Sequence, residues 1–326
     1  MIYHDDIYGK TEINEPLILE LLETPALKRL DGILQHGITA LIGVTEPVTR
    51  LDHSIGAMLL VRRMGASVEE QAAALLHDVS HTVYSHVIDN VFDSALSQSY
   101  HDNVKAEYVS TTQIPAVLTK FGFDWAYVLE ETNYPILEQP SPRLCGDRVD
   151  YSLRDSVPMG VATLSDVADL LSHLVLHEGR IMVDSVQAAR WLADVFIEMD
   201  QKSWANFWEV GLYELTARAL RHAFKIGAMS YDDLWRTDAV VWEQLHAHPN
   251  NELQVMLKLV SPDVEIVWDA ENPTFSVATK LRTIDPDVVG SGGDYRPLSQ
   301  LDPTYKQKRE TYLAKNKGAW PMRVIV

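Results

Sequence analysis

Apolar residues recur every three or four positions along most of the chain, which is the spacing of amphipathic helices. Thr24 and Pro25 form a cap residue followed by proline at the first helical position, and they predict a helix from about residue 24 to residue 34. A second helix is predicted over 52–64. Ser67 and Glu70 form a capping-box pattern before the apolar run AAALL, so a third helix is expected to start there.

The same spacing predicts further helices over 84–95, 101–120, 145–156, 165–177, 185–203, 205–226 and 231–245. Strand patterns are scarce before the end of the chain, where 264–268, 274–278 and the last residues, MRVIV, are rich in β-formers. The Gly/Ser/Pro-rich stretch 289–303 predicts a loop or flap. We therefore expect a mainly α fold with a small β-appendage near the C-terminus.

Composition narrows the class of protein. With 46% hydrophobic and 23% charged residues the chain is an ordinary globular protein, and its single cysteine, Cys145, excludes intramolecular disulfides and Cys-rich zinc modules. The formal charge of −18 argues against polymeric nucleic acid as a partner. No apolar stretch predicts a signal peptide or a membrane span, so we expect a soluble, cytoplasmic protein.

Histidines cluster between residues 53 and 101, and they carry the strongest chemical signal. His77 and Asp78 are adjacent in LLHDVSHTVYSHVID, at the end of an apolar helix that leaves little room for unpaired polar groups. A divalent cation would satisfy both side chains, and His53 on the preceding helix offers a third ligand. An isolated His-Asp pair is more often an ordinary surface pair, and His81 and His86 suit either a site or the surface.

A fourth ligand is expected from the segment CGDRVDYSLRD. Asp147, Asp150, Tyr151, Arg154 and Asp155 follow one stripe of a helix there. A solvated helix face would give the same pattern, but Tyr151 and the small residues before the stripe favour a face turned into a cleft.

These motifs together resemble a known family. The order R-x-x-H-S, then H-D-x-x-H-x-x-x-S-H-x-x-D, then D-R-x-D-Y-x-x-R-D is similar to the HD-domain phosphohydrolases, and specifically to their deoxynucleoside triphosphate triphosphohydrolase branch. The opening DDIYGKTEINEPLILELLETPALKRLDGILQHG resembles that branch too. The resemblance covers about residues 5–155. It implies an HD-domain helical bundle over 1–160, with a helical extension and small β-region over 161–326 packed on it as one unit.

The resemblance also implies roles for individual residues. It implies that the metal ligands are His53, His77, Asp78 and Asp147. It implies that the acid/base network at the scissile bond consists of His86, Asp89, His101 and Asp102. It implies that phosphate and sugar are bound by Gln35, His36, Arg50, His81, Arg148, Tyr151 and Asp155. His36 stands where the family commonly has an apolar residue, so looser discrimination at the sugar is expected.

The expected activity is hydrolysis of a (deoxy)nucleoside triphosphate to nucleoside and triphosphate. One divalent transition metal (Mn, Fe, Co, Ni or Zn) would serve it, with Mg on the substrate phosphates. A nucleotide phosphomonoesterase or pyrophosphohydrolase is the alternative within the superfamily. A non-hydrolytic nucleotide-binding module and a di-iron oxygenase are the alternatives from other classes. The expected partner is a small nucleotide or another phosphate ester, and a homo-oligomer is compatible with the sequence.

Overall fold

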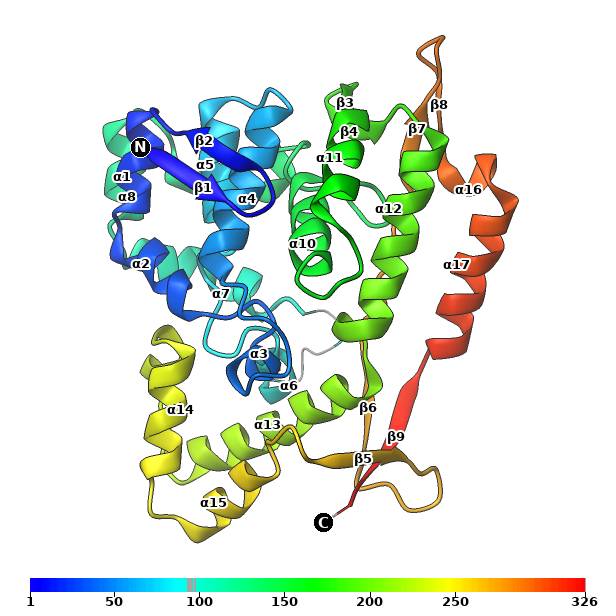
Figure 1. The fold of residues 1–326 in the computed structure, drawn as a ribbon. Coiled ribbons are helices and arrows are strands. Elements are labelled where there is room, and N and C mark those ends of the chain that lie inside the picture. The colour runs from blue at the N-terminus through cyan, green and yellow to red at the C-terminus, as the bar shows by residue number, and fades with distance from the viewer. Residues whose placement is uncertain (93–95, 97, 326) are drawn as a thin grey trace.

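The computed structural model describes residues 1–92, 96 and 98–325, and its N-terminal half is a bundle of short and medium helices behind a β-hairpin (Figure 1). The hairpin is formed by β1 (Ile2–Asp5) and β2 (Gly9–Glu12). The helices that follow are α1 (Pro16–Leu22), α2 (Pro25–Lys28), the 3₁₀ turn η1 (Arg29–Gly32), α3 (Ile38–Leu41), α4 (Arg50–Arg63), α5 (Val68–Leu76), α6 (Val87–Val91), α7 (Tyr100–Ser110), α8 (Ile114–Lys120), α9 (Trp125–Val128), the 3₁₀ turn η2 (Glu131–Asn133) and α10 (Gly146–Ser156).

The centre of this half is α4, which packs against both α5 and α10. Thr49 and Asp52 form a capping box at its start, where each side chain accepts the other residue's backbone N–H. Every residue from His53 to Val61 is buried, so the middle of α4 has no solvent-exposed face. A central helix that is covered all round can hold a polar residue only if a neighbouring helix supplies its partner.

The C-terminal half adds helices and two more sheets. Its elements are α11 (Leu164–His173), β3 (Leu174–His177), β4 (Arg180–Val183), α12 (Val186–Met199), the π-helical turn η3 (Asp200–Trp204), α13 (Phe207–Lys225), the 3₁₀ turn η4 (Asp232–Trp235), α14 (Asp238–Ala247), α15 (Asn251–Lys258), β5 (Glu265–Trp268), β6 (Phe275–Ala278), β7 (Asp287–Val289), β8 (Tyr295–Pro297), α16 (Leu298–Leu301), α17 (Pro303–Asn316) and β9 (Ala319–Ile325). One sheet has the order β3-β4-β7-β8 and the other the order β5-β9-β6.

The mainly α class is confirmed, and so are the three late strands, which pair as β5, β6 and β9. The expectation that strands are scarce before the end is wrong, because two hairpins form earlier. The helix predicted over 165–177 ends at His173, and the chain then enters β3. The stretch 289–303 is not simply a loop, since it closes the β7–β8 hairpin and begins α16 and α17.

Some helix boundaries differ from the predicted ones, because turns and 3₁₀ segments interrupt the predicted helices. The helix predicted over 101–120 is two helices, with a turn before Pro115 in the first turn of α8. The one predicted over 24–34 passes into the 3₁₀ turn η1 after Lys28. The one predicted over 84–95 is α6, and residues 93–95 lie outside the described residues.

Candidate active site

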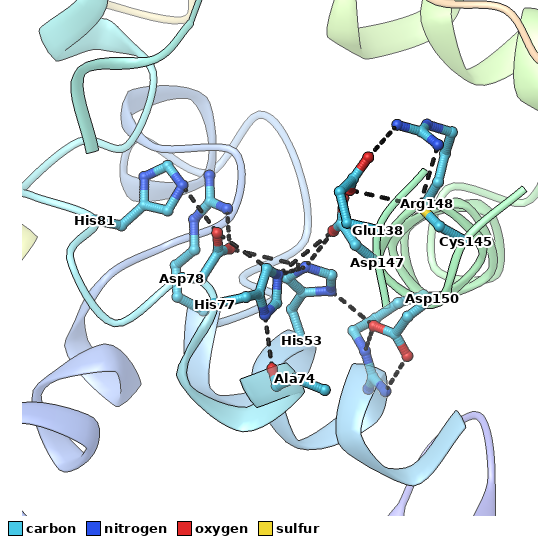
Figure 2. Close-up of polar contacts among 12 residues, drawn as sticks. His53, Ala74, His77, Asp78, His81, Glu138, Cys145, Asp147, Arg148 and Asp150 are labelled. Carbon is cyan, nitrogen blue, oxygen red and sulfur yellow. Dashed lines mark hydrogen bonds and ion pairs between the residues drawn. The ribbon is translucent and has the colours of Figure 1, made fainter. Parts of the chain in front are cut away.

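Four side chains from three elements converge at the centre of the bundle. His53 comes from α4, His77 and Asp78 follow directly on α5, and Asp147 lies in the first turn of α10. The His53 Nε2 atom lies 3.0 Å from Asp147 Oδ1 and 3.1 Å from His77 Nε2. Asp78 places its carboxylate oxygens 3.6 Å from His77 Nε2 and 3.7 Å from His53 Nε2 (Figure 2). The structure thus brings together all four predicted metal ligands.

The two imidazoles are oriented by partners on their far side. His53 Nδ1 lies 2.8 Å from Asp150 Oδ2, and His77 Nδ1 lies 2.7 Å from the Ala74 carbonyl oxygen. Both partners are acceptors, so each Nδ1 carries a hydrogen, and in the neutral ring each Nε2 presents a lone pair. Two lone pairs and two carboxylates that face one another repel unless a cation lies among them. The donor set therefore suits a divalent transition metal, with the outer hydrogen bonds that metal-binding histidines usually make.

The electrostatics of the four side chains agree with a cation site. Burial alone would lower the pKa of His77, but the carboxylates of Asp78 and Asp147 raise it to about 10. Burial would raise the pKa of Asp147, but its hydrogen bonds with His53 and His77 hold it well below its usual range. The carboxylates favour positive charge at this point, whether a proton or a metal supplies it.

A buried ion-pair chain supports His53 from behind. Arg154 donates to both oxygens of Asp150, at 3.0 and 3.1 Å, and to Asp5 at 2.9 Å. Gly56 makes room for this chain, because a Cβ at that position would lie 1.9 Å from the Arg154 guanidinium. The β-hairpin at the N-terminus therefore contributes to the site through Asp5.

Three more histidines form a group beside the four ligands. The rings of His81 and His101 are stacked, with centroids 3.8 Å apart, and His86 is edge-on to both. His81 Nε2 lies 3.2 Å from Asp78 Oδ1. Asp78, His81 and His101 also place three ligand atoms within 4.8 Å of one another, so these residues form a second group that could hold a cation.

The predicted acid/base residues occupy this group. Asp89 lies 2.9 Å from His86 Nδ1 and stands behind it, and Asp102 lies 3.3 Å from His101 Nε2. Asp89 and Asp102 favour the protonated form of these rings, but burial outweighs them. The pKa of His86 is therefore lowered and that of His101 falls to about 4.

A cavity of about 660 Å³ joins these groups to all seven predicted substrate-binding residues. Its lining includes Gln35, His36, Arg50, His81, Arg148, Tyr151 and Asp155. Arg50 donates to Asp78 Oδ2 at 2.5 Å and to Ser85 Oγ at 3.1 Å. Arg148 donates to Glu138 at 3.0 Å and to the Arg143 carbonyl oxygen at 2.7 Å. Both guanidiniums are therefore held in place before any substrate enters.

The helical stripe expected to face one cleft is divided between two surroundings. Asp147, Tyr151 and Asp155 line the cavity, as the stripe predicts. Asp150 and Arg154 do not line it, because they are buried between α10, α4 and the N-terminal hairpin. The expectation that they face the cleft is wrong for these two residues. Asp150 is paired with His53, and Arg154 is paired with Asp5.

Several cavity residues were not predicted. Lys105 is buried on α7, one turn after His101, where it pairs with Asp102 and Glu131. The i, i+4 spacing from His101 was the available signal. Trp204, Glu209 and Arg282 come from the C-terminal half, and no motif links them to the histidines.

Comparisons with known proteins place this site in a family. The HD-domain family model matches residues 50–127, which include His53, His77 and Asp78. A metal-dependent phosphohydrolase, cns2 of Cordyceps militaris, is 37% identical over 321 residues, which cover 96% of this chain and 92% of that one. The chain belongs to the HD-domain metal-dependent phosphohydrolases. This phosphohydrolase is also 38% identical to YdhJ, an uncharacterized protein of Bacillus subtilis, over 97% of both chains.

More distant matches agree on the fold. The deoxynucleoside triphosphate triphosphohydrolase SAMHD1 of Gallus gallus is 26% identical over 163 residues, covering 42% of this phosphohydrolase and 26% of that protein. A solved phosphohydrolase structure from Bacteroides thetaiotaomicron has a TM-score of 0.75 at 17% identity and covers 99% of this chain and 98% of that one. Among the described residues, every helix falls short of the length or hydropathy that a membrane span requires.

Proposed function

We propose that this phosphohydrolase cleaves the phosphate ester of a nucleotide in the 660 Å³ cavity. The observation that carries the proposal is the junction of two groups in one cavity. The four predicted metal ligands line this cavity, and the His81, His86 and His101 group lies beside them. The site can thus hold a cation against a phosphate and place an imidazole near the leaving oxygen.

His53, His77, Asp78 and Asp147 would hold the metal, for which we propose Mn, Fe, Co, Ni or Zn, with Mg on the substrate phosphates. Such a cation neutralises phosphate charge and lowers the pKa of bound water. The protein itself keeps the two imidazoles in the tautomer that leaves Nε2 free. It also holds Arg50 against Asp78 at 2.5 Å, where the guanidinium faces both the ligand group and the cavity.

Proton transfer to the leaving oxygen is assigned to the histidine group. His101 lines the cavity, and Asp102 lies beside its Nε2 atom. Asp89 fixes the tautomer of His86 through the 2.9 Å contact with Nδ1. Because burial lowers the pKa of both rings, either imidazolium would give up its proton readily.

Release of triphosphate from a deoxynucleoside triphosphate is the first candidate reaction. Its support is the motif order over residues 5–155 and the partial likeness to the triphosphohydrolase SAMHD1. Gln35, Tyr151 and Asp155 line the cavity at positions that match the family's sugar-binding residues.

The charge of the cavity favours a second candidate, a nucleotide with a shorter phosphate chain. Carboxylates outnumber lysine and arginine side chains among the described lining residues. Four of these cations, Arg50, Lys105, Arg148 and Arg282, are already paired with acids. A triphosphate brings more negative charge than a monophosphate, so it needs more unpaired cations.

The two candidates differ in their products. The purified protein, loaded with Mn²⁺ or Co²⁺, is incubated with ribo- and deoxyribonucleoside mono-, di- and triphosphates, and phosphate, pyrophosphate, triphosphate and nucleoside are measured separately. Triphosphate release supports the first candidate, and phosphate release from a monophosphate supports the second. The nucleotide proposal is rejected if the preparation hydrolyses p-nitrophenyl phosphate but releases nucleoside from none of the nucleotides. Asp78→Ala is the inactive control.

A further inference from the structure

One end of the cavity is built by the C-terminal half and has no role in the chemistry described above. Ser203 and Trp204 come from the π-helical turn η3, and Glu209 and Tyr213 come from α13. His36 meets them from the N-terminal half, and Tyr213 donates to its carbonyl oxygen at 2.8 Å. Single π-helical turns inside or beside α-helices occur frequently at functional sites.

Hydrogen bonds tie these residues into one chain. Ser203 Oγ donates to Glu209 Oε2 at 3.2 Å and lies 3.2 Å from His36 Nδ1. Since the serine hydrogen is used by Glu209, His36 donates to the serine oxygen. The other ring nitrogen of His36 lies 3.4 Å from Asp155 Oδ1. Both nitrogens of His36 thus face protein partners already, and the chain ends in two carboxylates, Asp155 and Glu209.

Glu209 is a buried carboxylate whose nearest cationic neighbour is His36 rather than a lysine or arginine. Its side chain lies in the cavity lining, and the residue is 7% exposed. Within the described part of the chain, no lysine or arginine forms an ion pair with it at 4 Å or less. Burial raises its pKa to about 7, although the charge of His36 and the hydroxyls of Ser203 and Thr39 act in the opposite direction. A buried carboxylate in this state gains most from a ligand that brings an N–H or O–H donor.

Aromatic side chains stand beside the same end of the cavity. Trp204 donates its indole N–H to Asp155 Oδ2 at 2.9 Å, which fixes the ring. Tyr151 and Phe196 contact it edge-on, with centroids 4.9 and 5.0 Å away, and all three rings line the cavity. Flat apolar rings beside one acceptor suit the nucleoside part of a nucleotide better than its phosphates.

We propose that Glu209 accepts a hydrogen bond from a donor group on the nucleoside part of the substrate and thereby sets the enzyme's selectivity. The donor is an N–H of the base or a hydroxyl of the sugar. This inference rests on the proposed function, because it requires a nucleotide in the cavity. Glu209 is a specificity residue, and the reacting phosphate lies at the metal end.

The test compares kcat/KM for nucleotides that differ by one donor. Guanosine against inosine removes the 2-amino group, adenosine against purine riboside removes the 6-amino group, and ribo- against 2′- and 3′-deoxyribonucleotides removes a hydroxyl. The phosphate chain is the one that the wild-type enzyme hydrolyses. We expect one pair to differ by about 10- to 100-fold in wild type, because a site that pairs a polar group rejects the analogue that lacks it.

The deciding variant is Glu209→Leu, which keeps a similar volume and cannot accept a hydrogen bond. We expect the preference in that pair to fall to about threefold or less. Glu209→Gln, which keeps a weaker acceptor, should give an intermediate ratio, and it serves as the second variant if the leucine protein does not fold. Glu243→Gln is the control. It makes the same charge change as Glu209→Gln, but on the exposed face of α14, and should keep the wild-type ratio of kcat/KM values in that pair.

The outcomes separate this inference from the proposed function. A folded Glu209→Leu enzyme that keeps the wild-type ratio overturns the role of Glu209 while nucleotide hydrolysis stands. A wild-type enzyme that hydrolyses nucleotides with no preference in any pair does the same. A wild-type enzyme that cleaves p-nitrophenyl phosphate but no nucleotide overturns both the proposed function and this inference.

Discussion

His53 is held by two partners at opposite ring nitrogens, and this makes a residue outside the cavity important for the metal. Asp150 lies 2.8 Å from Nδ1, while Nε2 faces Asp147 and His77. Outer partners of this kind fix the tautomer of a metal-binding histidine and raise its basicity. Asp150 is fully buried, so solvent cannot replace it.

We therefore expect Asp150→Asn to weaken metal affinity by about 10- to 100-fold, the usual effect of losing such a partner. The affinity is measured by competition with a chelator of known strength. Asp169→Asn makes the same change at an exposed position of α11 and should leave the affinity unchanged. An Asp150→Asn protein that folds and binds metal as tightly as wild type would show that the tautomer is fixed in another way.

The pKa of His101 gives a signed pH prediction for its role as general acid. Burial lowers this pKa to about 4, so the protonated fraction of the free enzyme falls about tenfold per pH unit near neutrality. The kcat/KM ratio of wild type to His101→Ala should therefore decrease as the pH rises from 6 to 8. The ratio of the two proteins cancels the titration of groups that they share.

At the pH of best activity, His101→Ala should reduce turnover by about 10²- to 10⁴-fold with unchanged metal content. Metal content is measured by elemental analysis of both proteins. Loss of metal in the variant would instead assign His101 to a cation site with Asp78 and His81, which place their ligand atoms close to it. A flat pH ratio would remove His101 from the proton-transfer step.

At the residue scale, the sequence predicted the metal ligands better than the residues that hydrogen-bond to those ligands from behind. His77 and Asp78 could be found because they are adjacent in an apolar run, where unpaired polar groups are costly. Asp150 and Arg154 could not be separated from Tyr151 and Asp155, since all four follow one helical stripe. Only the packing of α10 against α4 decides which of them faces the cavity.

At the scale of elements, the capping-box pattern at the start of α5 predicted one of its two hydrogen bonds correctly. The Ser67 hydroxyl accepts the Glu70 N–H at 3.1 Å, as the capping-box pattern predicts. The Glu70 carboxylate does not return to the cap. It accepts the backbone N–H groups of Ile136 and Leu137, which belong to the segment before α10. A tertiary partner outcompeted the local one, and spacing within one helix contains no information on that choice.

The start of α14 offers a prediction on the pH dependence of stability. Asp238 is 1% exposed and accepts the N–H groups of Leu34 and Tyr84, at 2.9 and 2.7 Å. Burial raises the pKa of its carboxyl to about 7 in spite of these two bonds. Between pH 4 and 7 the folded state therefore retains a proton that the unfolded state has lost. The free energy of unfolding must then decrease as the pH rises through this window.

We expect Asp238→Asn to remove this contribution, which is on the order of 4 kcal/mol. The free energy of unfolding is measured by urea denaturation at several pH values for both proteins, and the difference between them is plotted against pH. The difference should change steadily from pH 4 to 7 and level off above. A difference that is independent of pH would mean that Asp238 titrates near its ordinary value in the folded protein.

At the scale of the whole molecule, the cavity belongs to both halves of the chain. Its lining includes residues between Gln35 and Asp155 of the N-terminal half. It continues in the C-terminal half with Ser203, Glu209 and the segment 277–283, which begins at the end of β6. The sequence motifs end near residue 155, so they predicted the metal end and missed most of the other end. Figure 1 shows α13 lying below α3 and α6 of the N-terminal bundle, and β6 below the end of α12. Contacts between such distant segments leave no periodic signal in the sequence.

Hydrogen bonds between the two halves predict that residues 1–160 do not fold alone, although this segment contains all four metal ligands. The backbone N–H groups of Leu34 and Tyr84 donate to Asp238, and that of Val83 donates to the Leu234 carbonyl oxygen at 3.0 Å. Each buried donor left without its acceptor costs about 1–3 kcal/mol. The sum is comparable to the total stability of a typical domain, about 5–15 kcal/mol, before the apolar faces of α6 and α10 are uncovered.

We expect a 1–160 fragment to retain helical far-ultraviolet circular dichroism, to bind the dye ANS and to lose the cooperative thermal transition that the full chain shows. Its metal affinity should fall well below that of the full chain, because an unfolded site must pay the cost of folding when it binds. Addition of Mn²⁺ or Co²⁺ tests whether the metal can compensate. A fragment that melts cooperatively and binds metal like the full chain would establish 1–160 as an independent domain and confine the C-terminal half to substrate binding.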